Sequence, residues 1–104
     1  MPDPSERLVA RIERDFESAR HQDVIAWLRG LKTEDYGGQN PERLQAALVL
    51  TASGDWTGFM NAVRLLRIDW RDLLVAGGLA HEDWISVLDR ELPTPDRDPD
   101  AHRR

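Results

Sequence analysis

The sequence predicts an all-α fold, and three observations lead to this prediction. Apolar residues recur at helical intervals of three and four from residue 5 to residue 92, and residues that favour helix starts precede several of these stretches. The chain has 104 residues, the usual length of one domain. We therefore expect a single helical domain over residues 1–92, with five to seven short helices packed as an irregular orthogonal bundle.

The first helix is expected to begin at Ser5, whose side chain can cap it. Its apolar stripe follows steps of four, four and three residues, through Leu8, Ile12, Phe16 and Ala19. Arginines and acidic residues are equal in number over residues 5–20, so the other side of this helix is expected to be a solvated salt-bridge face. A second helix is expected from about Asp23 to Leu31, with Gly30 weakening or ending it.

The only long connection between helices is expected at residues 32–39. Tyr36 stands before Gly37-Gly38, which predicts a tight reversal with the ring folded back onto the core. Asn40 and Pro41 then form a strong helix start, because a capping residue precedes a proline at the first helical position. We expect this helix to continue to Gly54.

An Asp-Trp pair recurs at intervals of 14 residues in the last part of the domain, at Asp55-Trp56, Asp69-Trp70 and Asp83-Trp84. Each pair is followed by two apolar residues, three and four positions after the tryptophan. An aspartate that caps free N–H groups explains the pattern, with the tryptophan as the first helical residue. This predicts helices near 55–67, 69–77 and 82–92. Shared capping is favoured over a true repeat, because 14 residues is shorter than known helical repeat units.

Residues 93–104 contain three prolines and a balanced set of three arginines and three aspartates. This Pro/Asp/Arg-rich segment cannot bury an apolar face, so we expect a mobile tail. The first residues show no secretory signal, and no apolar run approaches the roughly 20 residues of a membrane helix. The expected location is cytoplasmic, with no contact with a membrane.

Composition and motifs disfavour several functions. There is no cysteine, which excludes disulfides and thiolate chemistry, and the three histidines match no metal-ligand spacing. No nucleophile motif, phosphate-binding loop or pair of opposed carboxylates can be identified. We therefore expect no catalytic residues, no cofactor and no metal, and a non-enzymatic role.

The charge balance also disfavours nucleic-acid binding, which usually shows a basic footprint. The net charge is -5 for the chain and -4 for residues 21–92. A small basic ridge of Arg64, Arg67 and Arg71 leads into Trp70, but the helix that follows is mostly apolar and carries an acid. A compact nucleic-acid-associated regulator is the second hypothesis, and a small enzyme or ligand-binding protein is the third.

Protein–protein contact is the favoured hypothesis. The chain has four tryptophans, which a small core cannot easily enclose, and tryptophan is enriched at interaction hot spots. We expect at least one of three tryptophans to be partly exposed on a surface used for self-association or for another protein. With the basic ridge, the candidate interaction residues are Trp56, Trp70, Trp84, Arg64, Arg67 and Arg71.

One segment carries a resemblance. Asp69-Trp70-Arg71-Asp72-Leu73-Leu74, with Gly54-Asp55 before the previous helix, resembles an Asp-Trp/Tyr-Arg-Asp-apolar-apolar segment of small bacterial all-helical proteins with no assigned activity. The similarity covers less than half of the chain. It implies an all-helical fold and a bacterial cytoplasmic setting, and it carries no functional residues. If these residues are structural, Asp69 caps, Trp70 packs, Arg71 and Asp72 pair with each other, and Leu73 and Leu74 enter the core.

Overall fold

Helices account for all the regular structure in the part of the chain that the computed structural model describes, residues 3–92. The helices are α1 (Glu6–Asp15), α2 (Ser18–Arg29), α3 (Pro41–Ala52), α4 (Trp56–Ile68), α5 (Trp70–Ala76) and α6 (Trp84–Glu91), and a 3-10 turn, η1 (Thr33–Tyr36), lies between α2 and α3. This confirms the all-α prediction and the expected number of helices. The expected tail, residues 93–104, lies outside the described residues. No helix within residues 3–92 has the length and apolar character needed to cross a membrane.

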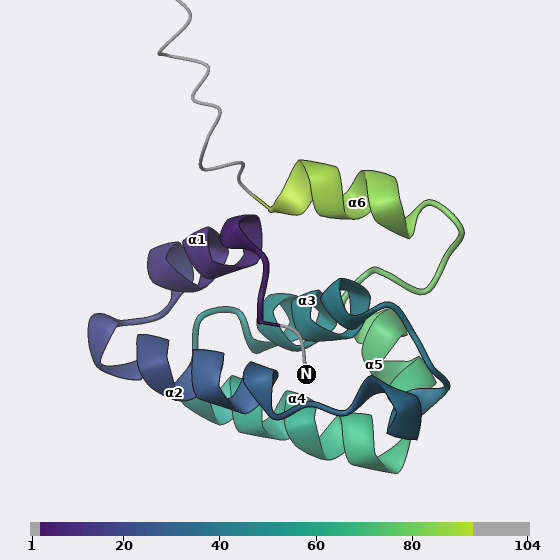
Figure 1. Ribbon diagram of the computed structural model, residues 1–104, viewed down its shortest axis with the longest axis horizontal. Helices are drawn as coiled ribbons and strands as arrows, with labels where there is room; N and C mark the ends of the chain where they lie inside the picture. The colour runs from purple at the N-terminus through teal and green to yellow at the C-terminus, as the bar shows by residue number, and fades with distance from the viewer. Residues whose placement is uncertain (1–2, 93–104) are drawn as a thin grey trace, which may run out of the picture.

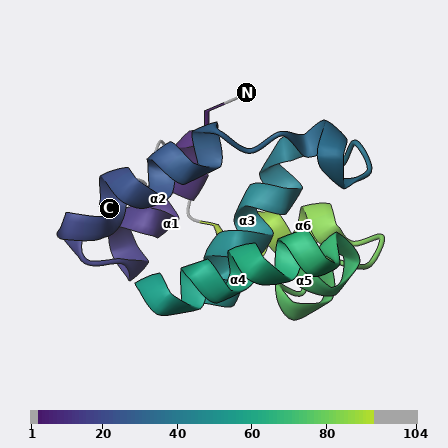
Figure 2. The ribbon, with the colours of Figure 1, turned by 90° about the horizontal axis from the view of Figure 1, so that it is seen from below.

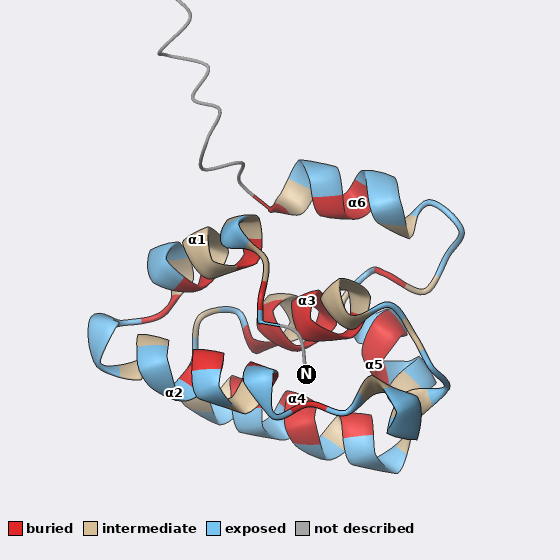
Figure 3. Cartoon of the chain, viewed as in Figure 1, coloured by how far each residue is buried: buried red, intermediate tan, exposed pale blue. Residues whose placement is uncertain are grey.

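Helix α3 is the centre of the fold (Figures 1 and 2), with α1 and α6 on one side of it and α4 on the other. Six consecutive residues, 44–49, are buried, including Gln45. A helix that is apolar on all sides must be covered on all sides, which is why α3 becomes the core element. Burial in the other helices is confined to the sides that face it (Figure 3). Small residues allow close approach, since Gly58 of α4 lies against Ala52 and Gly77 lies against Ala47.

Two of the expected helix starts follow directly from capping residues. The Ser5 hydroxyl accepts a hydrogen bond from the backbone N–H of Leu8. The Asn40 side chain accepts one from Glu42 N at 2.9 Å, and Pro41 occupies the first helical position. A side-chain oxygen that satisfies a free N–H at a helix start stabilises the helix by about 1 kcal/mol.

The predicted first helix is wrong at its end. It stops at Asp15, and Phe16 adopts an extended conformation, so that a new helix begins at Ser18 and Ala19 is exposed on it. Phe16 is buried with its ring edge against Phe59 of α4, with 6.2 Å between ring centroids. This contact between distant parts of the chain explains why the apolar stripe leaves the helix there. Consequently α2 begins five residues earlier than expected, and it ends at Arg29 with Gly30 as its cap.

The outer side of α1 is also more than a solvated salt-bridge face. The Arg7 guanidinium donates to Glu42 of α3 at 2.8 Å and to Asp89 of α6 at 2.6 Å. Arg11 donates to Asp15 and to the backbone carbonyl of Glu91, both at 2.5 Å. These hydrogen bonds join α1 to α3 and α6. The bonds from Arg7, followed by one from Ser5, lower the pKa of Glu42.

The three Asp-Trp pairs do begin three helices, but only two of the aspartates act as predicted. Asp55 accepts from Gly58 N at 2.8 Å, and Asp69 accepts from Arg71 N at 3.0 Å. Asp83 makes no side-chain cap, which corrects the third prediction. The reason is its backbone: Asp83 lies in a turn with ψ 15°, whereas Asp55 and Asp69 are extended, as a cap requires.

Candidate functional site

All four tryptophans are partly buried, and each lies beneath an arginine. The distance from the guanidinium carbon to the ring centroid is 4.6–5.8 Å, for the pairs Arg20–Trp56, Arg71–Trp70, Arg43–Trp84 and Arg67–Trp27. Such a cation–π contact stabilises an exposed site by about 0.5–1 kcal/mol. Arg71 therefore contacts Trp70, and its predicted ion pair with Asp72 is not formed.

The six predicted interaction residues do not form one surface. Arg64 and Arg67 lie in the second half of α4, and Trp70 and Arg71 begin α5, so these four are close along the chain. Trp56 lies at the other end of α4, and Trp84 begins α6 beneath Arg43 of α3. Arg67 and Arg71 line different pockets, and Arg43, which lines the same pocket as Trp70, also lies over Trp84.

Ion pairing divides the basic residues into two groups. Most arginines outside the ridge contact a carboxylate within 4.0 Å, namely Arg7, Arg11, Arg14, Arg20, Arg29 and Arg90. Arg43 instead donates to the carbonyl of Leu79 and to the Gln39 side chain. Within residues 3–92, Lys32, Arg43, Arg64, Arg67 and Arg71 have no ion pair. In the described part of the chain, positive charge without a carboxylate partner therefore lies at Arg43 of α3, at the end of α4, at the start of α5 and in the segment after α2.

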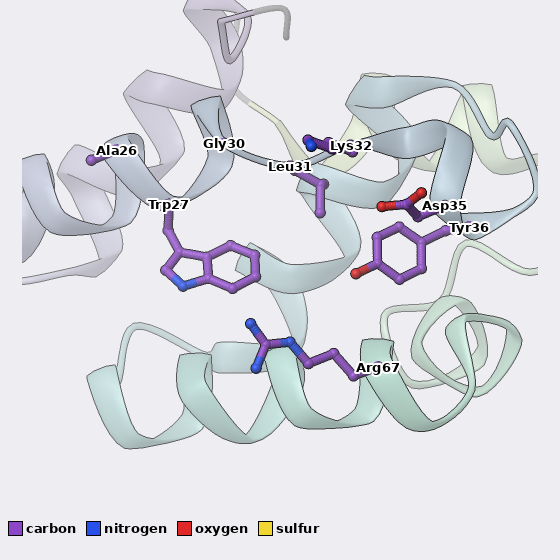
Figure 4. Close-up of a pocket in the computed structure, with 8 residues that line it drawn as sticks. All are labelled: Ala26, Trp27, Gly30, Leu31, Lys32, Asp35, Tyr36 and Arg67. Carbon is purple, nitrogen blue, oxygen red and sulfur yellow. The ribbon is translucent and has the colours of Figure 1, made fainter.

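A pocket of about 350 Å³ opens between α2, η1 and α4, and we call it the Trp27 pocket. Figure 4 shows Trp27 and Tyr36 on opposite sides of it, with Arg67 reaching from α4 toward the Trp27 ring. Lys32 and Asp35 supply one charge of each sign. The full lining is Ala26, Trp27, Gly30, Leu31, Lys32, Asp35, Tyr36 and Arg67.

The local sequence explains why this pocket forms. Gly30 ends α2 one turn after Trp27, and the buried Leu31 holds the chain against the core as it leaves the helix. The 3-10 turn then places Tyr36 against the core, as predicted, and Gly37 closes the turn with φ 75°. Positive φ favours glycine, and a side chain here would also meet the Trp70 ring. Gly37 therefore lets the turn pack closely against the Trp70 ring at the start of α5.

The aromatic wall at Trp27 is held in place. Its ring meets Phe59 edge-on, with 6.0 Å between centroids and an interplanar angle of 85°, and Arg67 lies over the ring. A guanidinium that stacks on an aromatic ring keeps its N–H groups available in the plane of the fork. The pocket thus combines aromatic surface with donors on Lys32 and Arg67, an arrangement suited to a carboxylate next to an apolar or aromatic group.

Two other pockets contain Trp70 and Trp56. The Trp70 pocket, of about 300 Å³, is lined by Gln39, Arg43, Trp70, Arg71, Leu74, Val75 and Ala80. The Trp56 pocket, of about 520 Å³, is lined by Asp15, Glu17, Arg20, Gly54, Asp55, Trp56 and Thr57. The Trp56 pocket has three acidic residues, and its Arg20 pairs with Asp23, so its charge is opposite to that of the ridge.

Sequence analysis identified Arg67 but missed its neighbours Trp27, Lys32 and Tyr36 as site residues. One signal was available, because Tyr36 was predicted to fold back from the only long connection. A ring at that position brings the connection against another helix, and the lone lysine lies in the same segment.

Comparison of the chain with models of known protein families, with curated proteins and with solved structures found no match. Within residues 3–92 no group of three or more His, Asp or Glu side chains is placed to hold a metal ion. The function must therefore be argued from the geometry of the surface.

Proposed function

We propose that this protein is a protein-interaction domain whose Trp27 pocket binds an acidic segment of a partner protein. The observation that carries the proposal is the location of the unpaired cations. Lys32 and Arg67 line an open aromatic pocket, and Arg64 lies one turn before Arg67, in a chain whose net charge is -5. We also propose a cytoplasmic location and, from the resemblance carried by residues 69–74, a bacterial source.

Electrostatics favour an acidic partner at this face. Cations that already contact carboxylates contribute little potential beyond the pair, whereas unpaired cations attract anions over about one Debye length, 8 Å at physiological salt. The Arg67 fork can hold a carboxylate with two parallel hydrogen bonds. A partner segment with Asp or Glu would therefore be both steered and oriented.

The aromatic walls add an apolar requirement. Trp27 and Tyr36 are both partly exposed, and tryptophan, tyrosine and arginine are the residues most enriched at interaction hot spots. We therefore propose that the bound segment carries an aromatic or large aliphatic side chain among its acidic residues.

A phosphate backbone would be attracted by the same cations, so the two partners must be separated by experiment. Asp35 at the pocket and the acidic total of the chain disfavour a long polyanion, which needs many phosphate contacts. A short peptide contacts only the few cations that are available here.

The test is fluorescence anisotropy with a short fluorescein-labelled peptide of Asp and Glu around a single Phe. We expect saturable binding that is lost at about 1 M salt, where the Debye length is about 3 Å. Arg67→Gln should weaken binding about fivefold, corresponding to about 1 kcal/mol. Arg90→Gln, which removes the same charge from α6, is the matched control and should change affinity less than twofold, by roughly 0.4 kcal/mol.

Three further arms decide between the alternatives. A peptide with Lys in place of Asp and Glu, and one with Ala in place of Phe, should both bind more weakly. A labelled single-stranded oligothymidylate of equal charge should bind more weakly than the acidic peptide. Tighter binding of the oligothymidylate, or equal losses for Arg67→Gln and Arg90→Gln, would contradict the proposal.

A further inference from the structure

A large, exposed apolar side chain stands at the edge of the Trp70 pocket, whereas the large apolar residues that line the Trp27 pocket are buried or partly buried. Val75 of α5 lines the pocket and is 66% exposed. Leu74 and Trp70 line the interior, and both pack with the core. An apolar projection beside an apolar hollow is self-complementary, since a two-fold axis between them places the Val75 of each copy in the hollow of the other.

The charges around the Trp70 pocket are also self-complementary. Arg71, one turn before Val75, lines the pocket and has no ion pair within residues 3–92. Ala80 lines it too, and is followed two and three residues later by Glu82 and Asp83, both exposed. Neither acid has an ion pair within the described residues, and Asp83 is free because it does not cap α6.

We propose that the chain forms a symmetric dimer through the face around the Trp70 pocket, with a second copy of itself as the occupant. A two-fold rotation brings Arg71 of each copy toward Glu82 and Asp83 of the other copy. The Val75 side chain of each copy then fills the Trp70 pocket of the other. Arg43 lines the same pocket without an ion pair and adds a second positive charge, and Asp72, exposed beside Arg71, offsets one of the two. Cyclic two-fold symmetry is the commonest arrangement of homo-oligomers.

This inference does not depend on the proposed function, because Val75, Glu82 and Asp83 do not line the Trp27 pocket. A dimer that fails to bind the acidic peptide would support the dimer and contradict the proposed function. A monomer that binds the peptide would do the reverse. The dimer would present two Trp27 pockets, so a partner with two acidic segments would gain affinity from the second contact.

The test is sedimentation velocity of the full chain over a range of concentrations. The wild type should change from monomer to dimer and go no further. Val75→Glu should raise the dissociation constant at least about 100-fold, because symmetry counts the substitution twice. Ile68→Glu is the matched control: it adds the same charge at a more exposed apolar residue outside this pocket, and it should leave the dimer intact. Since both side chains are exposed, both variants should fold, which circular dichroism checks.

Variants with exchanged charges test the proposed contacts between Arg71 and the two acids of the other copy. Arg71→Glu alone, and the pair Glu82→Arg with Asp83→Arg, should each weaken the dimer at least about 10-fold, whereas the three substitutions together should restore it. A wild type that stays monomeric at all concentrations overturns the proposal. So do oligomers larger than a dimer, a stronger effect of Ile68→Glu than of Val75→Glu, and a triple variant that remains monomeric.

Discussion

Replacing each of the three repeated aspartates by alanine tests how this fold begins its helices. Asp55, Asp69 and Asp83 have the same sequence context, since each stands before a tryptophan and the same apolar spacing. Their hydrogen bonding differs, because two of the carboxylates accept a hydrogen bond from a backbone N–H and the third accepts none. The three variants each remove one negative charge from the same acidic chain. Differences between them therefore report the cap itself.

The expected magnitudes follow from the hydrogen bonds. Asp55→Ala leaves the Gly58 N–H without its 2.8 Å partner, and Asp69→Ala does the same to Arg71 N–H. Loss of an N-cap costs about 1 kcal/mol, within a range of about 0.5–2. Asp83→Ala removes only an exposed charge near a helix start, which is worth about 0.5 kcal/mol or less.

Thermal unfolding followed by circular dichroism measures the series. For a domain of this size 1 kcal/mol corresponds to about 4–8 °C in Tm. We expect Asp55→Ala and Asp69→Ala each to lower Tm by about that amount, and Asp83→Ala to lower it by less than half as much. Equal losses in all three variants would refute the reasoning, because they would mean that the shared sequence pattern, and not the observed backbone at Asp83, decides the capping.

Two further predictions concern packing and pH. Gly58→Ala should destabilise the fold by about 1 kcal/mol, although alanine favours helices. The reason is that the new Cβ would lie 2.6 Å from the Ala52 carbonyl oxygen. A rise in Tm would contradict the close approach of α4 to α3. Because hydrogen bonds from Arg7 and Ser5 lower the pKa of Glu42 in the folded state, its carboxylate stabilises the fold at neutral pH, and this contribution is lost as the pH falls below about 4.5 through the lowered value. Urea unfolding at several pH values measures this contribution. As the pH falls, the free energy of unfolding should decrease less for Glu42→Gln than for the wild type. An equal decrease in both proteins would refute the role of the Glu42 carboxylate.

The parts of the fold that sequence analysis predicted well depend on local chemistry. A cap at Asn40 with Pro41, a cap at Asp55 and a glycine at the end of α2 each act within a few residues, so their effect can be predicted without knowledge of the fold. The break after Asp15 could not be predicted in this way. Neither Gly nor Pro marks it, and its cause is the burial of Phe16 against Phe59, which belongs to a distant helix.

The candidate site was harder to predict because it depends on which charges find partners. Arg7 and Arg67 are equivalent in sequence terms, yet Arg7 contacts two carboxylates on other helices and Arg67 contacts a tryptophan ring. Sequence alone identified the basic ridge. It could not show that Trp27, rather than Trp70, lies beneath Arg67, since that contact joins α2 to α4.

Binding of an acidic segment at the Trp27 pocket can be measured directly, because the chain has four tryptophans. Their indole N–H signals in a nuclear magnetic resonance spectrum report three pockets and the Arg43–Trp84 contact separately. On titration with the acidic Phe-containing peptide at constant protein concentration, we predict that the Trp27 signal moves and saturates while the Trp56 signal stays in place. A Trp27 signal that does not move, while the signal of Trp56 or Trp84 does, would contradict binding at the Trp27 pocket.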